Sequence, residues 1–338
     1  MNNPLVSVIV PAYNAAASIK QCIESIENQV GVSFEAIVIN DGSSDATASI
    51  LEELARSRPW LIVINRKNSG VSAARNAGMK AASGRFLTFL DADDMLAPGA
   101  LHALVSAITT ANTNLVYGAY EAFGKHISPR RIAEFSEEWN TSVHSGRDVL
   151  PLLLSLADDT PSGAAWRILF EKDYLQKLGV KFPEGIRMSE DYCFMLWVLA
   201  SDPLVSVTDK VVYRYRMHSE SATSKYMPSM RNDMDYVNSQ IFEICKDIPY
   251  LMEFYQDCVA NTCLTVAQNE LMNPMRKGRT RRCKQIFNLD EYRRAVRQIS
   301  GRSTLTSAKT LVLKVAYRSP LLGTLFLEAF QAMKSVSR

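Results

Sequence analysis

Blocks of consecutive apolar residues alternate with amphipathic stretches over the first hundred positions of the chain. The apolar blocks, rich in Val, Ile, Leu and Phe, predict strands at residues 6–10, 34–39, 61–64 and 86–90. The stretches between them predict helices at residues 15–29, 45–56 and 71–82. Strands that are apolar on both faces and alternate with helices are typical of a parallel sheet covered on both sides. The pattern therefore predicts an α/β fold with a mostly parallel sheet flanked by helices.

After residue 100 the pattern is less regular. It predicts helices at 100–110, 146–157 and 192–200 and strands at 114–120 and 211–215. From about residue 230 onward, apolar residues recur at helical spacing. We therefore predict a first domain over residues 1–225, with halves of about 1–100 and 101–225, followed by a helical, basic C-terminal region over 226–338.

Three polar loops follow predicted strands of the first half. They are Pro11-Ala12-Tyr13-Asn14, Asn40-Asp41-Gly42-Ser43-Ser44-Asp45 and Asp91-Ala92-Asp93-Asp94. The carboxyl ends of parallel strands meet at one edge of the sheet, and ligands of such sheets bind there. The three loops are therefore predicted to converge on one ligand site.

Asp91 and Asp93 place two carboxylates at the end of a core strand, where their mutual repulsion and desolvation are costly. Hard divalent cations prefer oxygen ligands and keep several waters, so Asp91-Ala92-Asp93 suits Mg²⁺ or Mn²⁺ over a diphosphate. The alternative is helix capping, with Asp94 as the N-cap of the helix that follows Pro98. Capping explains one acid but not three.

The loop after the second strand admits two roles for its acids. Asp45 is a good N-cap for the following helix, whereas Asp41 stands at the sheet edge, where it could accept a hydrogen bond from a nucleobase N–H. Arg75, on the next helix, would either hold the nearby acids in place or reach a phosphate. Gly78 is interpreted as a position of close helix–sheet packing.

Glu190 and Asp191 open a predicted apolar helix. Both would complement the helix dipole as acids of the first turn. A carboxylate at this place could equally act as the general base that takes a proton from an attacking hydroxyl. His218 follows a predicted strand in a polar loop, where it is either structural or close to a bound phosphate.

The composition is that of a water-soluble globular protein. The chain has 338 residues, of which 47% are hydrophobic and 22% charged. Its longest apolar stretch, residues 311–333, is interrupted by charges and a proline, and the N-terminus has no basic lead, so neither a membrane span nor a signal peptide is expected. The six cysteines form no CxxC pair, which favours reduced thiols in the cytoplasm over disulfides or zinc.

The C-terminal region is strongly basic. Residues 276–318 contain 13 Lys or Arg and 2 Asp or Glu, and residues 321–333 place apolar side chains along one broad helical face. One interpretation is a helix packed on its own domain with a solvated basic face. The other is peripheral binding to an anionic membrane. Nucleic-acid binding is not expected, because the basic run lacks interleaved aromatic residues.

Taken together, the motifs resemble the inverting family 2 glycosyltransferases of the GT-A fold, which have a Rossmann-like sheet. The resemblance spans roughly residues 5–225. It rests on five fragments in sequence order: VSVIVPAYNAAASIKQCIESIENQ, FEAIVINDGSSDAT, NSGVSAARNAGMKAASGRFLTFLDADD, SEDYCFMLWVLA and YRYRMHSESAT. It implies transfer of one sugar from a nucleotide sugar, expected to be UDP-linked, to a hydroxyl of a glycan or lipid-linked glycan in O-antigen, capsule or exopolysaccharide synthesis.

The resemblance also assigns roles to residues of this chain. The implied catalytic pair is Asp191 as base, assisted by Glu190. Asp93, and His218 by its position, would hold a Mn²⁺ or Mg²⁺ ion. The implied nucleotide-binding residues are Pro11, Tyr13, Asn14, Asp41, Arg75, Asp91 and Ala92. The expected location is the cytoplasm or the inner face of the plasma membrane, and the helical tail could pair two chains into a homodimer.

Two departures from the family pattern change the prediction. Many relatives carry two acids before Gly-Ser, whereas this chain has Asn40 before Asp41, so base recognition is assigned to Asp41 alone. Processive relatives carry a Gln-x-x-Arg-Trp motif after the base, but no tryptophan occurs after Trp197. The alternatives are a non-catalytic nucleotide-binding scaffold and a nucleotidyltransferase, and the latter lacks the glycine- and lysine-rich loop expected after the first strand.

Overall fold

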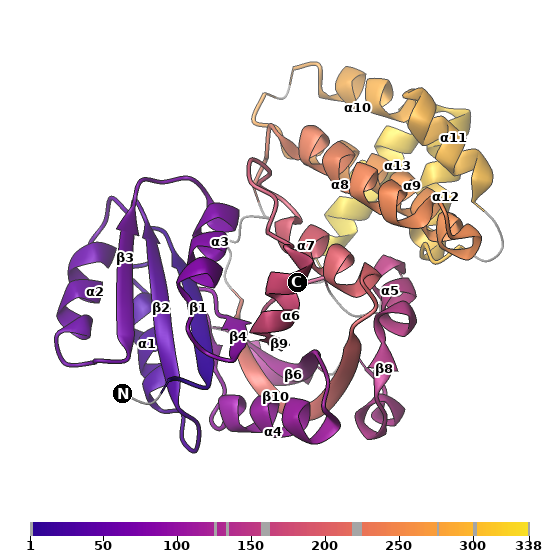
Figure 1. The fold of residues 1–338 in the computed structure, drawn as a ribbon. Coiled ribbons are helices and arrows are strands. Elements are labelled where there is room, and N and C mark those ends of the chain that lie inside the picture. Colours follow the sequence, from indigo (N-terminus) through magenta and orange to yellow (C-terminus); the bar gives the residue numbers. More distant parts are fainter. Residues whose placement is uncertain are drawn as a thin grey trace. The chain divides into compact units, whose positions relative to one another are not determined.

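The computed structural model describes residues 3–124, 127–132, 135–156, 163–217, 225–275, 277–299 and 303–336. It divides the chain into two compact units. The first contains residues 1–150 and 161–218, and the second contains residues 151–160 and 219–338. The first unit is a sheet with helices on its faces, whereas the described part of the second is helical (Figure 1).

The sheet of the first unit has the strand order β3-β2-β1-β4-β9-β6-β10-β5, and β7 pairs with β6 while β8 pairs with β10. Its strands are β1 (Val6–Ala12), β2 (Phe34–Asp41), β3 (Leu61–Arg66), β4 (Phe86–Phe89), β5 (Met95–Leu96), β6 (Leu115–Gly124), β7 (Ile127–Ile132), β8 (His144–Ser145), β9 (Ile168–Glu171) and β10 (Leu204–Arg216). The four strands from β3 to β4 are mutually parallel, as the apolar blocks predict.

Helices cover this parallel half of the sheet. The helices of the first unit are α1 (Ile19–Glu27), α2 (Thr47–Ala55), α3 (Val71–Ala81), α4 (Ala100–Ala111), α6 (Lys172–Leu178) and α7 (Glu190–Ala200); α5 (Gly146–Leu154) lies at the boundary of the two units. Val8 of β1 belongs to the core that includes Ile23 of α1, whereas Ile9 faces α3. A Cβ atom at Gly78 would lie 2.3 Å from Ile9 Cγ2, which confirms the predicted close approach of helix and sheet.

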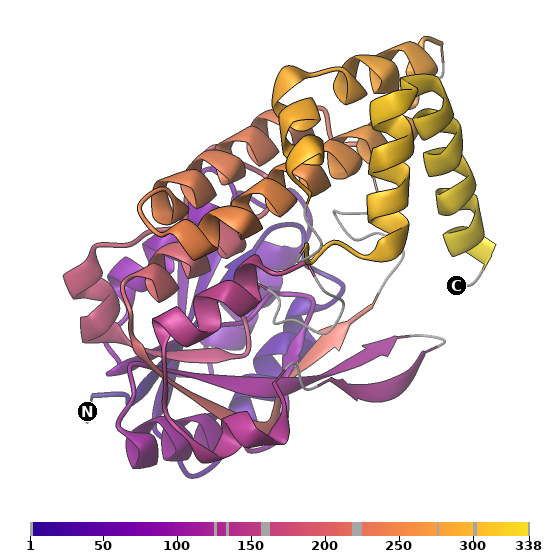
Figure 2. The same ribbon diagram turned by 90° about the vertical axis from the view of Figure 1, so that its right-hand side faces the viewer.

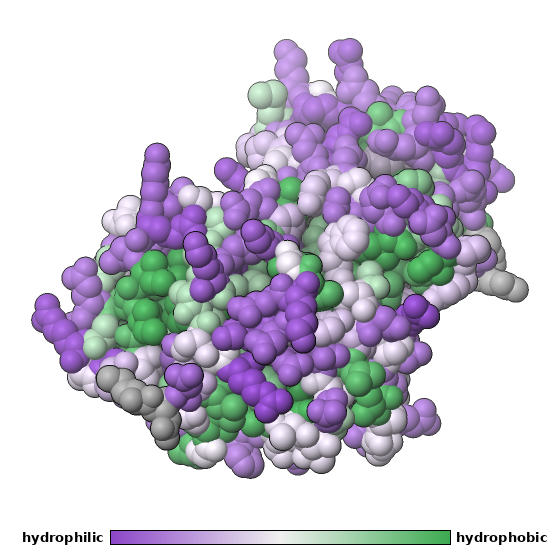
Figure 3. Space-filling model, viewed as in Figure 1, coloured by the Kyte–Doolittle hydropathy of each residue, from purple (hydrophilic) through white to green (hydrophobic). Residues whose placement is uncertain are grey.

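The outer edge of the sheet is less covered than the pattern predicts. Ile62 of β3 is 40% exposed, and Figure 3 shows a hydrophobic surface over β2 and β3. All seven residues of β1 are buried, whereas Leu61 is the one buried residue among the six of β3. The prediction of a sheet covered on both faces therefore holds for the central strands and fails at β3.

The second half of the sheet is mixed. β9 runs antiparallel to both β4 and β6, whereas β6 and β10 are parallel with two register shifts. The sequence pattern predicted neither β9 nor the first seven residues of β10. Because β9 has only four residues, it carries no periodic signal. This antiparallel strand joins the two halves into one sheet.

The second unit contains α8 (Met230–Cys245), α9 (Pro249–Leu271), α10 (Arg279–Phe287), α11 (Asp290–Gln298), α12 (Ser307–Arg318) and α13 (Pro320–Val336). α12 and α13 lie side by side (Figure 2), and a Cβ atom at Gly323 would lie 2.3 Å from Ala316 Cβ. None of the helices in the described ranges is long and apolar enough to cross a membrane.

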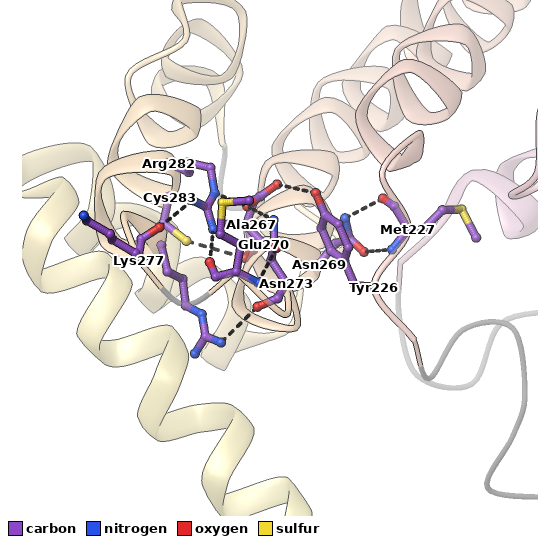
Figure 4. A network of polar contacts seen from close by, with 11 residues as sticks. Tyr226, Met227, Ala267, Asn269, Glu270, Asn273, Lys277, Arg282 and Cys283 are labelled. Carbon is purple, nitrogen blue, oxygen red and sulfur yellow. Dashed lines mark hydrogen bonds and ion pairs between the residues drawn. The ribbon is translucent and has the colours of Figure 1, made fainter.

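A polar network holds the C-terminal end of α9 (Figure 4). Asn269 accepts a hydrogen bond from the backbone N–H of Met227 and donates one to its carbonyl, both at 2.8 Å. Glu270 pairs with Arg282 of α10 at 2.6 Å and accepts a hydrogen bond from the hydroxyl of Tyr226. Because these partners come from three segments, the network fixes the register of α9 against α10 and the chain before α8.

Candidate active site

The loops after β1 and β2 are joined by direct hydrogen bonds at the carboxyl edge of the sheet. Asn14, in the left-handed region with φ of 49°, donates its backbone N–H to Ser43 Oγ at 3.0 Å. Its side-chain oxygen accepts a hydrogen bond from the backbone N–H of Ser44 at 2.8 Å. Convergence of these two predicted loops is therefore confirmed. Pro11 is buried within β1, whereas Tyr13 is 55% exposed.

Asp41 is buried and already has several partners. It accepts hydrogen bonds from the backbone N–H groups of Ser69 and Gly70 at the start of α3, and Arg66 Nε lies 3.3 Å from its Oδ1. These contacts fix the loop that leads from β3 into α3. Recognition of a nucleobase N–H by Asp41 stays a prediction. Asp45 accepts a hydrogen bond from the backbone N–H of Thr47 at 3.0 Å, but the N-cap of α2 is Ala46, so the prediction that Asp45 is the N-cap is wrong.

Arg75 joins acids from two distant parts of the sequence. Its NH2 group lies 2.9 Å from Asp91 Oδ1, and its NH1 group lies 2.8 Å from Glu190 Oε1. The Arg75 side chain is 6% exposed. Burial opposes its charged form, but Asp91 and Glu190 more than offset this and raise its pKa. Of the two predicted roles, the described contacts show that Arg75 holds the acids in place.

Asp191 follows Glu190 in the first turn of α7. Burial, and next to it the charge of Glu190, raises the pKa of Asp191 to about 7, although Arg75 acts in the opposite direction. A general base is most effective when its pKa lies near the working pH. The Asp191 carboxylate therefore has the electrostatic environment of a general base. It lies at the edge of the sheet where Arg75 pairs with Asp91 and Glu190.

Asp94 is not a helix cap, and this corrects one alternative drawn from the sequence. The N-cap of α4 is Gly99, whereas Asp94 is 1% exposed and contacts β10. It accepts hydrogen bonds from the hydroxyl of Tyr213 at 2.7 Å and from the backbone N–H of Arg216 at 2.6 Å. Burial, and next to it Asp91, raises the pKa of Asp94 to about 8.

Hydrogen bonds from β10 therefore hold the acidic turn, residues 91–94, in place. The backbone N–H of Asp91 donates to the hydroxyl oxygen of Tyr213 at 3.2 Å, and Arg216 Nε donates to the carbonyl of Asp93 at 2.8 Å. Asp94, Tyr213 and Arg216 were missed as site residues. The sequence signal was present, since Asp94 belongs to the acidic turn and the two others to YRYRMHSESAT, but only the sheet order brings them together.

The acidic turn offers oxygen ligands to a divalent cation. Asp91 uses Oδ1 for Arg75, and Asp93 is partly exposed two residues further on; Ala92 between them is buried. Among the described residues, no three His, Cys, Asp or Glu side chains form a metal-binding group. This donor set fits Mg²⁺ or Mn²⁺, which bind proteins through one or two carboxylates and take other ligands from phosphate and water. His218 lies outside the described residues.

The chain is similar to known glycosyltransferases. The family model described as glycosyl transferase family 2 matches residues 7–174. The chain is 28% identical to the uncharacterized glycosyltransferase EpsJ of Bacillus subtilis over 99% of both chains. It is 26% identical to an Escherichia coli enzyme named UDP-Glc:alpha-D-GlcNAc-diphosphoundecaprenol beta-1,3-glucosyltransferase WfgD, over 75% of this chain and 93% of that protein.

Among solved structures, the fold is similar to that of S. aureus TarS 1–349 in complex with UDP-GlcNAc. The TM-score is 0.63 at 18% sequence identity, and the match covers 97% of this chain and 91% of TarS 1–349. The same fragment has also been solved in complex with UDP, with the same TM-score. At this identity the similarity shows a shared GT-A fold, as predicted.

Proposed function

We propose that the chain is a family 2 glycosyltransferase, whose family model matches residues 7–174, and that it transfers one sugar from a UDP-sugar to a hydroxyl of a glycan or lipid-linked glycan, with inversion at the anomeric carbon. The observation that supports this most directly is the cluster of Asp191, Glu190, Arg75 and Asp91 at the carboxyl edge of the sheet. UDP and a lipid-linked acceptor are supported by the names of TarS complexes and of WfgD. The product would enter surface polysaccharide synthesis.

Asp191 would carry out the proton transfer. As the acceptor hydroxyl oxygen forms its bond to the anomeric carbon, the bond from that carbon to the diphosphate breaks, and the hydroxyl proton passes to Asp191. Glu190 would remain with Arg75 and orient the start of α7. No covalent intermediate is required, because the leaving group and the nucleophile lie on opposite faces of the sugar.

The donor would lie over the loops after β1, β2 and β4. The exposed ring of Tyr13 would stack on the base, with Pro11 and Asn14 shaping the loop beneath it, and Asp41 would meet the base N–H. Asp93, with the remaining oxygen of Asp91, would hold Mn²⁺ or Mg²⁺ against the diphosphate. When bound, the cation neutralises charge that develops on the leaving diphosphate.

Thermal stability tests the donor site directly. Wild-type protein is expected to melt at a higher temperature with one UDP-sugar and Mn²⁺ together, because a ligand that binds only the folded state stabilises it. Asp93→Ala should abolish this shift and keep the melting temperature of the ligand-free protein. The matched control is Asp173→Ala, an exposed acid in the first turn of α6, which should retain the shift. A wild-type protein that no nucleotide sugar stabilises would contradict the proposal.

The described part of α12 and α13 supports peripheral contact with an anionic membrane. Leu311 and four large residues of α13 are exposed, namely Leu321 at 43%, Leu322 and Leu325 at 50% and Phe326 at 47%. Lys314 and Arg318 of α12 are also exposed. Apolar side chains beside basic ones suit the surface of an anionic bilayer. The surface of Figure 3 over α10 and α11 is mostly hydrophilic, in keeping with their basic residues.

Vesicle flotation tests this surface in the full chain. The wild-type protein is expected to float with vesicles rich in phosphatidylglycerol and not with phosphatidylcholine vesicles. Leu322→Glu combined with Leu325→Glu should reduce the floated fraction at least about fivefold, because two charges replace exposed apolar contacts. Val30→Glu, at a residue 71% exposed in the first unit, is the control. Equal flotation of the double variant would contradict membrane contact, and a change from dimer to monomer in light scattering would assign this face to a homodimer.

A further inference from the structure

We propose that Trp166 and Tyr215 form a stacking platform for a sugar ring of the acceptor. The inference rests on the proposed function, because it names the substrate class and the position of the second substrate at the same site. It is carried by five observations: an aromatic stack, its contact with the acidic turn, the passage of the preceding chain beside α7, the backbone conformation of Arg167, and the polar groups that have no partner among the described residues.

The platform is a stack of three aromatic rings. The ring of Trp166 lies 4.5 Å from that of Tyr213 and 5.5 Å from that of Tyr215, with interplanar angles of 26° and 11°. Tyr120 meets the edge of Trp166 at 5.0 Å. Since Tyr213 and Tyr215 are two residues apart on β10, they lie on one face of the strand, and Trp166 covers both.

One side of this stack adjoins the acidic turn. The hydroxyl of Tyr213 donates to Asp94 and accepts from the backbone N–H of Asp91. The stack therefore lies next to the proposed position of the donor diphosphate.

The chain that leads to Trp166 passes the start of α7. A Cβ atom at Gly163 would lie 2.3 Å from Tyr192 Cδ2, so the chain there runs against the residue that follows Asp191. Three residues later the chain reaches Trp166. The segment that carries Trp166 therefore starts beside the first turn of α7, which holds Asp191.

The backbone that carries Trp166 is held in a strained conformation. Arg167, which is 2% exposed, has a φ of 64°, in the left-handed region that favours glycine. Its NH1 group donates to the carbonyl of Gly118 at 2.9 Å, and the Gly118 N–H donates to the Arg167 carbonyl at 3.0 Å. Strain of this kind is kept where the surroundings enforce it and is common at functional sites. Here it fixes the backbone immediately after Trp166 against β6.

The platform offers the groups that bind a sugar. Trp166 and Tyr215 are both partly exposed, and neither the indole N–H nor the Tyr215 hydroxyl has a hydrogen-bond partner among the described residues. The face of an aromatic ring is electron-rich and attracts positively polarised groups, such as the C–H groups on one face of a pyranose. The indole N–H and the phenol would then bind hydroxyl groups at the edge of the sugar.

Saturation-transfer NMR with simple sugars tests the platform without knowledge of the natural acceptor. The probes are methyl β-glucopyranoside, methyl β-galactopyranoside and methyl α-N-acetylglucosaminide, each with and without UDP and Mn²⁺. Wild-type protein is expected to saturate the ring C–H protons of at least one probe. Trp166→Ala should reduce that signal at least about fivefold, and Trp166→Phe should retain more than half of it. Trp139→Ala, at a tryptophan stacked on His144, is the control.

The outcomes separate this inference from the proposed function. A melting shift with UDP-sugar in both wild type and Trp166→Ala would show that the donor site and the fold of the variant are intact. An equal probe signal in Trp166→Ala and wild type, or no signal in wild type with any probe, would overturn the platform. Loss of the donor shift in the wild-type protein would instead count against the proposed function.

Discussion

Replacing Asp191 by Asn is expected to reduce kcat about 10³-fold, within the range that a general base contributes. The amide has the same shape but cannot accept the proton of the acceptor hydroxyl. Donor binding should be unchanged, because Arg75 pairs with Glu190 and Asp91 and not with Asp191. The measurement is transfer rate at saturating substrates together with the melting shift that UDP-sugar produces.

The pH dependence identifies the base independently. Burial raises the pKa of Asp191 to about 7, so its carboxylate becomes protonated, and inactive as a base, as the pH falls below that value. Wild-type kcat/KM should therefore fall with decreasing pH below about 7, and the residual activity of Asp191→Asn should lack this decline. Asp173→Asn, at an exposed acid of α6, is the control and should follow wild type. Full activity in Asp191→Asn would assign the proton transfer to another group.

Replacing Arg75 by Met should destabilise the first unit by about 3 kcal/mol, because it leaves Asp91 and Glu190 charged and partly buried without their shared cation. Transfer activity should fall as well, since Asp91 would no longer be held at the donor site. Urea unfolding followed by circular dichroism measures the first effect. Adding Glu190→Gln to Arg75→Met should restore part of the lost stability, because it removes one of the two uncompensated charges.

A matched arginine provides the control for this loss. Arg85 also pairs with a carboxylate, Glu171, but at 3.9 Å and with a side chain that is 59% exposed. Such surface pairs contribute about 0–1 kcal/mol, so Arg85→Met should unfold at nearly the wild-type urea concentration. If Arg75→Met and Arg85→Met lost equal stability, the buried position of Arg75 would have no special importance.

The parallel half of the fold could be predicted because its signal is local. β1, β2 and β4 are continuous apolar blocks, and loops at their carboxyl ends must meet once the strands are parallel. The same reasoning identified Asp41 and Asp91 as residues of one edge. It also identified Gly78 as a close contact, since few other roles suit a glycine inside a helix.

The rest of the site depends on pairings between distant residues. Asp94 looks like a helix cap in the sequence, but its partners Tyr213 and Arg216 are about 120 positions away and reach it only through the sheet order. The stack of Trp166 on β10 requires the antiparallel strand β9 as well, and a strand of four residues has no periodic signal. Pairing of this kind is a property of the folded sheet and not of any sequence window.

The hydrogen bonds between β10 and the acidic turn also determine when the site can form during synthesis. Asp94 is a buried polar group, and its hydrogen-bond donors at positions 213 and 216 leave the ribosome long after β1 to β4 have been made. At about 5–20 residues per second, roughly ten seconds separate the acidic turn from its partners. During that interval the strands can pair, but the turn lacks the contacts that offset its burial. The last strand of the sheet thus completes the site that the first four strands begin.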